Sequence, residues 1–309
     1  MFRRRPTHNK GGKSIKQLID IGGRHLEVSI RGKGHPVILL TGMVSSMAEW
    51  ESIANDLAEN TEMILFHRAG FGNSSKGSNP ANLYENVKDL KKLIDILELK
   101  SPVIVGHSYG GLFAQLFVHT YPDTASALVL VDSSSTDSHL LDEVEMEGND
   151  DNSMDAWMRK CRDYSKLTPS QLHDELSDWI YDLQASAPVD MKQPIQEFMS
   201  NPFMFATLAE ELEWWRNHPL SFDGFPQIPV TVIGRDPKVS IQEMIEEEGI
   251  SETEAEKIEE IWQYLITLQT KMSEKTTYVL AENSGHDIHT RKPDVIKQET
   301  LKVIEKILN

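Results

Sequence analysis

The sequence predicts a mostly parallel α/β protein with eight strands, and two observations carry that prediction. Apolar runs of strand length alternate with amphipathic helical patterns, and a short hairpin pattern precedes them. Runs that are apolar throughout suit strands buried on both faces, as in a parallel sheet with helices on either side. The runs are PVILLTG, EMILFHRAG, PVIVGHS, ALVLVDSS, VTVIGRD and TTYVLAE.

The hairpin is predicted from the segment KQLIDIGGRHLEVSI, which supplies the remaining two strands. Leu26, Val28 and Ile30 alternate on one face, and Gly22 and Gly23 mark a turn between the two short strands. We expect this antiparallel pair at an edge of the sheet.

Helical periodicity occupies the segments between the runs. Apolar residues recur every three or four positions in residues 83–97, 112–117, 251–268 and 293–308. The third of these begins at Ser251, with a Glu three residues later, which is the spacing of a capping box. These stripes predict helices that pack on the sheet.

Residues 137–220 break the alternation, because no strand pattern occurs there. We therefore expect a helical insertion over 137–220, a core formed by residues 17–136 and 221–309, and a basic flexible leader over 1–16. Aromatic and methionine side chains are frequent in the insertion; most should form its own core, and some should line the space between it and the sheet. They are Trp157, Tyr164, Trp179, Tyr181, Phe198, Met199, Phe203, Met204, Phe205, Trp214 and Trp215.

The amino-acid composition limits the classes of binding partner that the protein can have. The chain has 309 residues, a net charge of -17 and 39% hydrophobic residues, so it should fold as a globular protein that repels nucleic acid and anionic membranes. The apolar runs are too short to span a membrane, and the N-terminus lacks the apolar segment of a secretory signal. A single cysteine, Cys161, permits no internal disulfide. These features predict a cytoplasmic protein without stable membrane insertion.

A GxSxG pattern, Gly106 to Gly110, stands where a buried strand ends and an amphipathic helix begins. That context predicts a tight turn that lifts the hydroxyl of Ser108 above the sheet. The N-terminus of the following helix would direct amide groups and positive dipole at the same place, which would stabilise an oxyanion. Ser108 is therefore a candidate nucleophile.

With these residues the sequence resembles the α/β-hydrolase superfamily. GHSYGG is similar to the family's nucleophile turn, LLTGMVSSMAEW to its oxyanion loop, FHRAGFGNSS to its arginine-containing and glycine-containing turn, and AENSGHDIH to the turn that carries the catalytic histidine. The resemblance implies an α/β-hydrolase fold with a helical cap inserted after LVLVDSS.

A serine nucleophile requires a base and a carboxylate that orients it. The resemblance places the base at His286, directly after a glycine, and makes His289 a lesser candidate. For the acid, Asp236 ends the penultimate predicted strand and is the first choice. Asp132 ends the strand before it and is the alternative, since the resemblance also allows a carboxylate there.

The oxyanion hole is expected to use the backbone amides of Tyr109, which follows the nucleophile, and of Met43, to which the resemblance points. Two positions depart from the family's pattern. Thr41 stands where the family usually has His, and His67 stands where an Asp commonly precedes the arginine, here Arg68.

The chemistry implied is acyl transfer to water on a small, partly apolar substrate, as in a carboxylesterase. The family runs its dehalogenase and epoxide hydrolase reactions through an aspartate at the serine position, so those variants are excluded. No phosphate loop, dinucleotide motif, HExxH or cysteine cluster is present, so we expect no cofactor and no metal. The alternatives are a catalytically silent binding protein, or a cofactor-free lyase or acyltransferase on the same scaffold.

Overall fold

The computed structural model describes residues 15–144 and 153–309. Most of the predicted basic leader lies outside these residues, although its last two positions belong to strand β1 (Ile15–Asp20). No helix in the described part of the chain is long and apolar enough to cross a membrane.

The chain forms one eight-stranded sheet in the order β1-β2-β4-β3-β5-β6-β7-β8. The pairs β1 with β2 and β2 with β4 are antiparallel, and every other neighbouring pair is parallel. The predicted edge hairpin and the six apolar runs are therefore confirmed as strands. After β1 the strands are β2 (His25–Gly32), β3 (His35–Leu40), β4 (Thr61–Phe66), β5 (Val103–His107), β6 (Ala127–Val131), β7 (Val230–Arg235) and β8 (Thr276–Ala281).

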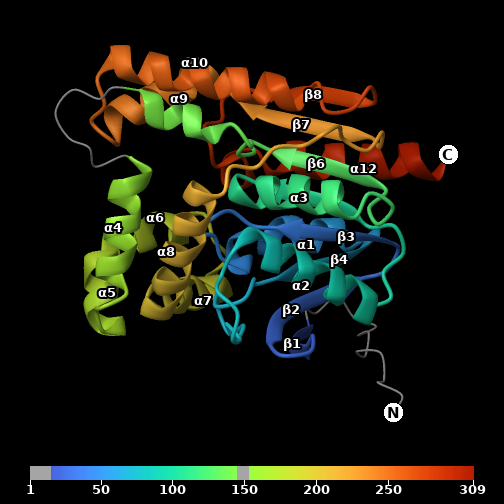
Figure 1. The fold of residues 1–309 in the computed structure, drawn as a ribbon, viewed down its shortest axis with the longest axis horizontal. Helices are drawn as coiled ribbons and strands as arrows, with labels where there is room; N and C mark the ends of the chain where they lie inside the picture. The colour runs from blue at the N-terminus through green and yellow to red at the C-terminus, as the bar shows by residue number, and fades with distance from the viewer. Residues whose placement is uncertain (1–14, 145–152) are drawn as a thin grey trace.

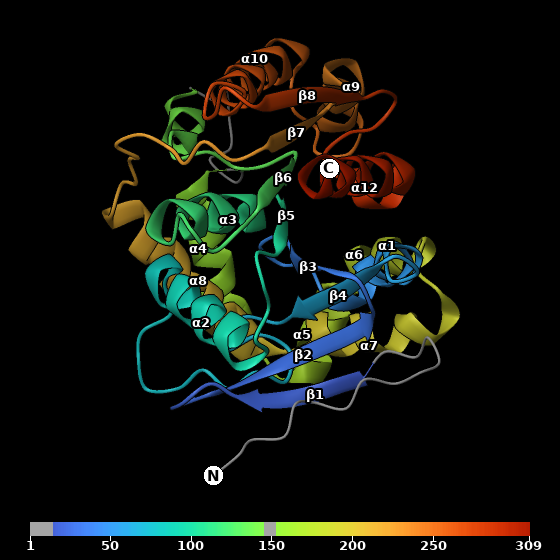
Figure 2. The same cartoon turned by 90° about the vertical axis from the view of Figure 1, so that its right-hand side faces the viewer.

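Helices cover both faces of the sheet, which explains why the strands are apolar throughout. Figure 2 shows α2 and α3 on one side and α1 and α12 on the other, and each pair belongs to a separate apolar cluster with the strands it covers. These and the helices that border the site are η1 (Met47–Trp50), α1 (Glu51–Leu57), α2 (Leu83–Ile96), α3 (Tyr109–Thr120), α9 (Pro237–Glu246), α10 (Glu252–Gln269), α11 (Ile288–Arg291) and α12 (Pro293–Leu308).

Between β6 and β7 the described chain contains helices and no strand. The arrowheads of β6 and β7 point toward the side on which α4 to α8 lie (Figure 1), so these cap helices stand beyond the carboxyl ends of the strands. Their apolar cluster includes Phe198 and Phe205, and it also takes in Ala48 and Phe71 from the core. The segment comprises η2 (Ser138–Glu143) and the cap helices α4 (Met154–Tyr164), α5 (Pro169–Glu175), α6 (Ser177–Ala185), α7 (Val189–Met199) and α8 (Pro202–Asn217).

The junction of β5 and α3 depends on glycines with no space for a side chain. A Cβ on Gly106 would lie 2.5 Å from the carbonyl oxygen of Gly110, and one on Gly110 would lie 2.3 Å from that of Leu40. A Cβ on Gly111 would lie 2.1 Å from Oγ of Ser133. The glycines flanking the candidate nucleophile therefore let strand β3, strand β5 and helix α3 approach one another closely.

Substituting Gly110→Ala should strongly destabilise the protein, because the added methyl group would collide with the backbone carbonyls of Leu40 and Thr41. We expect the free energy of unfolding to fall by on the order of 3 kcal/mol, measured by denaturant titration. The control is Gly249→Ala, where a Cβ meets nothing within 4 Å and only the positive φ of 70° is unfavourable. It should cost about 1 kcal/mol. Equal losses in the two variants would contradict the steric argument.

Candidate active site

Ser108 lies at the sharp bend between β5 and α3. Its backbone has φ 53° and ψ -125°, a conformation that is strained for a residue with a side chain. Hydrogen bonds hold it in place: its amide donates to the carbonyl of Val131 at 3.1 Å, and its carbonyl accepts from the amide of Ser134 at 3.1 Å. The bend is thus tied to the end of β6 as well as to its own strand.

The structure pairs His286 with Asp132. Nδ1 of His286 and Oδ2 of Asp132 are 2.6 Å apart, and the Asp132 side chain is fully buried. The other carboxylate oxygen accepts from the indole Nε1 of Trp262 at 2.9 Å and from the backbone amide of Arg235 at 3.2 Å. Because Asp132 occupies Nδ1, Nε2 is the nitrogen of His286 available for proton transfer.

Asp236, the first choice for the acid from sequence, has a different role in the structure. Its Oδ1 accepts from the amide of Lys238 and caps the N-terminus of α9, while its Oδ2 accepts from the amide of Asn283. Both carboxylate oxygens therefore bind backbone, and the partner of His286 is Asp132, the alternative. The Asp-Pro pair at the start of α9 is a helix start signal that indicates this capping role.

Electrostatics favour an ionised Asp132 beside a basic imidazole. Burial alone would raise the pKa of Asp132, but Arg235 first, then His286 and Trp262, hold it below its ordinary value. Burial alone would lower the pKa of His286, but the hydrogen bond and charge of Asp132 outweigh it and raise that pKa above 6.5. His286 is thereby made a stronger base than a free imidazole.

His107 brings the nucleophile turn and the histidine turn together. Its ring lies 4.8 Å from the ring of His286, and its Nε2 donates to the backbone carbonyl of His286 at 3.1 Å. Burial, followed by the nearby charges of His286 and His289, lowers the pKa of His107 to about 3, so it stays neutral. Ser108 and His286 therefore occupy one part of the molecule, joined through the residue that precedes the serine.

The predicted oxyanion residues lie on either side of the bend. Tyr109 begins α3, where the first helical amides have no partner within the helix. Met43 lies in the loop after β3, and its carbonyl accepts from Nη2 of Arg68 at 2.8 Å. Thr41, which replaces the family's histidine, donates its hydroxyl to the carbonyl of Ser45 at 2.9 Å and so closes this loop on itself.

His67, which stands where the family commonly has an aspartate, belongs to a buried polar network. The amide of Met47 donates to Nε2 of His67 at 3.1 Å, so in this arrangement Nδ1 carries the proton and donates to Glu27 at 2.8 Å. Glu27 also accepts from the backbone and the side chain of Asn73, both at 2.9 Å. The imidazole of His67 thus binds the backbone at Met47, and Glu27 on β2 holds that imidazole in place.

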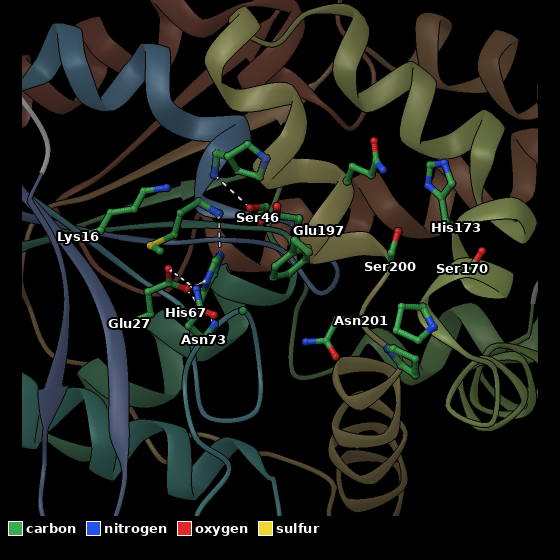
Figure 3. Close-up of a pocket in the computed structure, with 18 residues that line it drawn as sticks. Lys16, Glu27, Ser46, His67, Asn73, Ser170, His173, Glu197, Ser200 and Asn201 are labelled. Atoms are coloured by element: carbon green, nitrogen blue, oxygen red, sulfur yellow. Dashed lines mark hydrogen bonds and ion pairs between the residues drawn. The ribbon is translucent and has the colours of Figure 1, made fainter.

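A cavity of about 760 Å³ lies beside this network, between the core and the cap helices. Figure 3 shows Glu27, His67 and Asn73 on the core side and His173, Ser200 and Asn201 on the cap side. None of Ser108, Asp132 and His286 lines it. This cavity is therefore separate from the candidate catalytic groups.

One group of potential metal ligands occurs among the described residues. His107, Asp287 and His289 each offer an atom, and these atoms lie within 4.8 Å of one another. His107 already uses Nε2 for the carbonyl of His286, and the ring of His289 stacks on Trp50 with centroids 4.4 Å apart. These contacts give the group a packing role behind the histidine turn, and we assign it no metal.

Aromatic side chains of the cap segment reach both predicted oxyanion residues. Nε1 of Trp157 on α4 lies 3.3 Å from the sulfur of Met43, and the ring of Trp215 on α8 lies 5.6 Å from the ring of Tyr109. Trp215 also lines a smaller cavity of about 280 Å³ together with Met154, Pro219 and residues of the segment 136–142. Cap side chains therefore contact Met43 and Tyr109, the two predicted oxyanion residues.

A family model described as alpha/beta hydrolase fold matches residues 35–258, more than half of the chain. The chain belongs to this family. The match covers β3 to β7 and includes the bend at Ser108, the cap helices and Asp132.

Among curated proteins, this α/β hydrolase is 27% identical over 174 residues to the 2-hydroxy-6-oxo-2,4-heptadienoate hydrolase of Pseudomonas putida, covering 54% of the chain and 62% of that protein. It is 28% identical over 112 residues to the soluble epoxide hydrolase of a Corynebacterium species, covering 36% of the chain and 39% of that protein. The matches thus span less than two thirds of the length of either relative.

Solved structures agree on the fold. An epoxide hydrolase named CorEH has a TM-score of 0.65 at 19% identity, covering 96% of this chain and all of that one. An esterase from Exiguobacterium antarcticum has a TM-score of 0.61 at 15% identity, covering 94% of this chain and 98% of that one. At these identities the likeness concerns architecture alone.

Sequence reasoning missed the residues that hold the candidate acid. Arg235 lies beside Asp132 and is itself paired with Glu259 on α10 at 2.5 Å, and Trp262 comes from the same helix. In the sequence these residues read as the end of a strand and a helical stripe. Arg235 stands at the end of a strand pattern and Glu259 and Trp262 stand within a helical pattern, and neither pattern indicates that they meet at Asp132.

Replacing the carboxylate partner should lower the pKa of His286. In Asp132→Asn the charge that favours the imidazolium is lost and burial then dominates, so the pKa should move from above 6.5 to below it. Histidine ring NMR during a pH titration measures this value. The matched control, Asp236→Asn, should leave it unchanged, because both oxygens of Asp236 bind backbone amides. The reverse pattern would reinstate Asp236 as the partner.

The Glu27 network should stabilise the fold only above acidic pH. Burial would raise the pKa of Glu27, but the interaction with His67, then the two hydrogen bonds from Asn73, lower it from 4.5 to about 2. A lowered folded-state pKa contributes stability above pH 4.5, and that stability is lost as the pH falls toward 2. Glu27→Gln should thus be less stable than wild type by about 3 kcal/mol at neutral pH.

Denaturant titrations across the pH range measure this difference, which should shrink toward zero between pH 4.5 and 2. The control is Glu59→Gln, which changes an exposed side chain and should match wild type throughout. A difference for Glu27→Gln that does not vary with pH would show that the network acts through packing and not through charge.

Proposed function

We propose that this protein is a serine hydrolase that cleaves an ester or related acyl bond of a small, partly apolar substrate. The observation that carries the proposal is the 2.6 Å contact of His286 with the buried Asp132, beside a serine on a strained strand-to-helix bend. A nucleophile, a base and an orienting acid are the three roles that acyl transfer needs. In chain order they are Ser108, Asp132 and His286.

In the proposed reaction Ser108 attacks the acyl carbonyl while Nε2 of His286 takes its proton. The tetrahedral intermediate collapses as His286 returns that proton to the leaving alcohol, which leaves an acyl group on Ser108. Water, deprotonated by the same imidazole, then releases the acid and regenerates the serine. Asp132 fixes the tautomer of His286 and stabilises the imidazolium that forms in each half.

The oxyanion would be held by the backbone amides of Tyr109 and Met43. The position of Tyr109 as the first residue of α3 supports this role, because its amide adjoins the nucleophile and the positive end of the helix. Removing one donor from such a site costs about 2.7 to 4 kcal/mol of transition-state stabilisation. The conformation of the loop that holds Met43 would therefore contribute to catalysis in addition to the triad.

The aromatic side chains of the cap segment support a substrate with an apolar acyl or alkyl group. Trp157 contacts Met43 and Trp215 contacts Tyr109, so aromatic side chains of the cap segment lie beside both residues proposed to hold the oxyanion. Aromatic and thioether walls bind apolar groups with little directional demand. The proposed substrate is therefore an ester with an apolar acyl or alkyl group, and the proposed enzyme class is a carboxylesterase.

Labelling with a fluorophosphonate should separate this proposal from a catalytically silent binding protein. A working triad should attach the probe to Ser108, located by mass spectrometry, and turn over a series of p-nitrophenyl esters. Ser108→Ala should abolish labelling and reduce turnover by more than about 10³-fold, as expected when a nucleophile is removed. The control Ser78→Ala changes an exposed hydroxyl and should behave as wild type.

The outcomes distinguish the alternatives. Absence of label on wild-type Ser108 would favour the silent binding protein, and a loss of less than about tenfold in Ser108→Ala would reject this nucleophile. Label without net hydrolysis, together with product formation only when an alcohol is added, would favour an acyltransferase. A panel extended to a thioester and a lactone would define the bond type.

A further inference from the structure

Arg68 makes a buried ion pair that crosses from the core to the cap. Its Nε lies 2.9 and 3.1 Å from the two carboxylate oxygens of Glu211 on α8. The Arg68 side chain is 7% exposed and that of Glu211 is fully buried. A second core residue, Asn86 on α2, donates to Glu211 at 2.8 Å. The carboxylate is thus fully engaged at the place where core and cap meet.

The same guanidinium holds the oxyanion loop. Nη2 of Arg68 donates to the carbonyl of Met43 at 2.8 Å, and Nη1 lies 3.5 Å from the carbonyl of Gly42. The guanidinium also stacks over Phe71, 3.5 Å from the ring centre, and lies 5.2 Å from the ring of Tyr109. One planar group therefore contacts the cap glutamate, the loop that carries Met43 and the ring of the residue after the nucleophile.

The geometry requires an arginine. Its planar fork presents Nε to a carboxylate and its terminal nitrogens to carbonyls at fixed angles, which a lysine ammonium cannot do. Stacking on Phe71 sets the plane, and Glu211 sets the rotation within that plane. Without Glu211 the buried charge would lack a partner, and the guanidinium would turn toward other acceptors or water.

We propose that Glu211 is a positioning residue that acts through Arg68 to hold the oxyanion loop, so that the amide of Met43 is aligned only when the cap is docked. This inference rests on the proposed function, because it assigns the loop a part in acyl transfer. Glu211 touches no reacting atom. Its effect reaches the reaction through one guanidinium and one backbone carbonyl.

The neighbouring residue supplies a matched control. Glu210 on α8 also pairs with a core residue, Lys76, at 2.5 Å, but the two side chains are 43% and 27% exposed. Both glutamates therefore link cap and core, and only Glu211 is connected to the oxyanion loop. Glu211→Gln and Glu210→Gln make the same chemical change one position apart on the same helix.

The experiment compares the two variants in the full-length protein with two readouts. Hydrogen-deuterium exchange of the peptide that covers residues 41–46 should be at least about fivefold faster in Glu211→Gln, since the loop loses its anchor. The rate of fluorophosphonate labelling and kcat for p-nitrophenyl acetate should fall at least tenfold, with KM within threefold and an unchanged pH midpoint. Glu210→Gln should match wild type in all five quantities.

A second variant keeps the test valid if Glu211→Gln folds poorly. The double replacement Arg68→Met with Glu211→Leu removes both charges together, which is often neutral for stability. It should fold and still show fast loop exchange and slow labelling. Arg68→Lys should also show fast loop exchange and slow labelling, because it retains the charge without the planar fork.

The outcomes are distinct for the two proposals. Loop exchange and labelling within twofold of wild type in folded Glu211→Gln and in the double variant would overturn the positioning role. Fast loop exchange with slow labelling would support it. Failure of wild type to label would remove the proposed function and, with it, the catalytic part of this inference, even where loop exchange responds to Glu211.

Discussion

The close approach of β3, β5 and α3 around Ser108 is the constraint on which the candidate site depends. Three glycines leave so little space that any Cβ would lie within 2.5 Å of a neighbouring atom, and the serine between them takes a strained conformation. Hydrogen bonds from Ser108 to Val131 and Ser134 then fix the strained residue to the next strand. A flexible bend would relax, and the hydroxyl would lose its orientation.

A buried carboxylate, that of Asp132, orients the imidazole of the histidine turn. Asp132 has no exposed surface, so its charge is stable only because His286, Trp262 and the Arg235 amide donate to it and the Arg235 guanidinium lies 3.7 Å away. Glu259 in turn pairs with Arg235. Helix α10 thereby contributes Trp262, which donates to the acid, and Glu259, which pairs with the arginine beside it, although the helix lies far from β6 in the sequence.

The sequence was sufficient for the fold because apolar runs and helical stripes are local signals. It was not sufficient to choose between Asp132 and Asp236, because both follow a parallel strand and end at the same edge of the sheet. Their roles are decided by contacts across 154 and 47 residues, to His286 and Asn283. Glu27 and Glu211 were missed for the same reason: each reads as an ordinary polar position, and its partner is 40 or 143 residues away.

Two arginines with buried glutamate partners lie at the candidate site: Arg68 beside the loop of Met43, and Arg235 beside Asp132. Replacing such pairs by apolar residues is often neutral or stabilising, so they are weak evidence for stability. A guanidinium provides a fixed set of donors, which an apolar side chain cannot. Arg68 donates to the carbonyl of Met43, and the guanidinium of Arg235 lies beside the carboxylate of Asp132. Their position at the site, and the cost of burying them, are therefore better explained by the geometry they impose than by any gain in folding free energy.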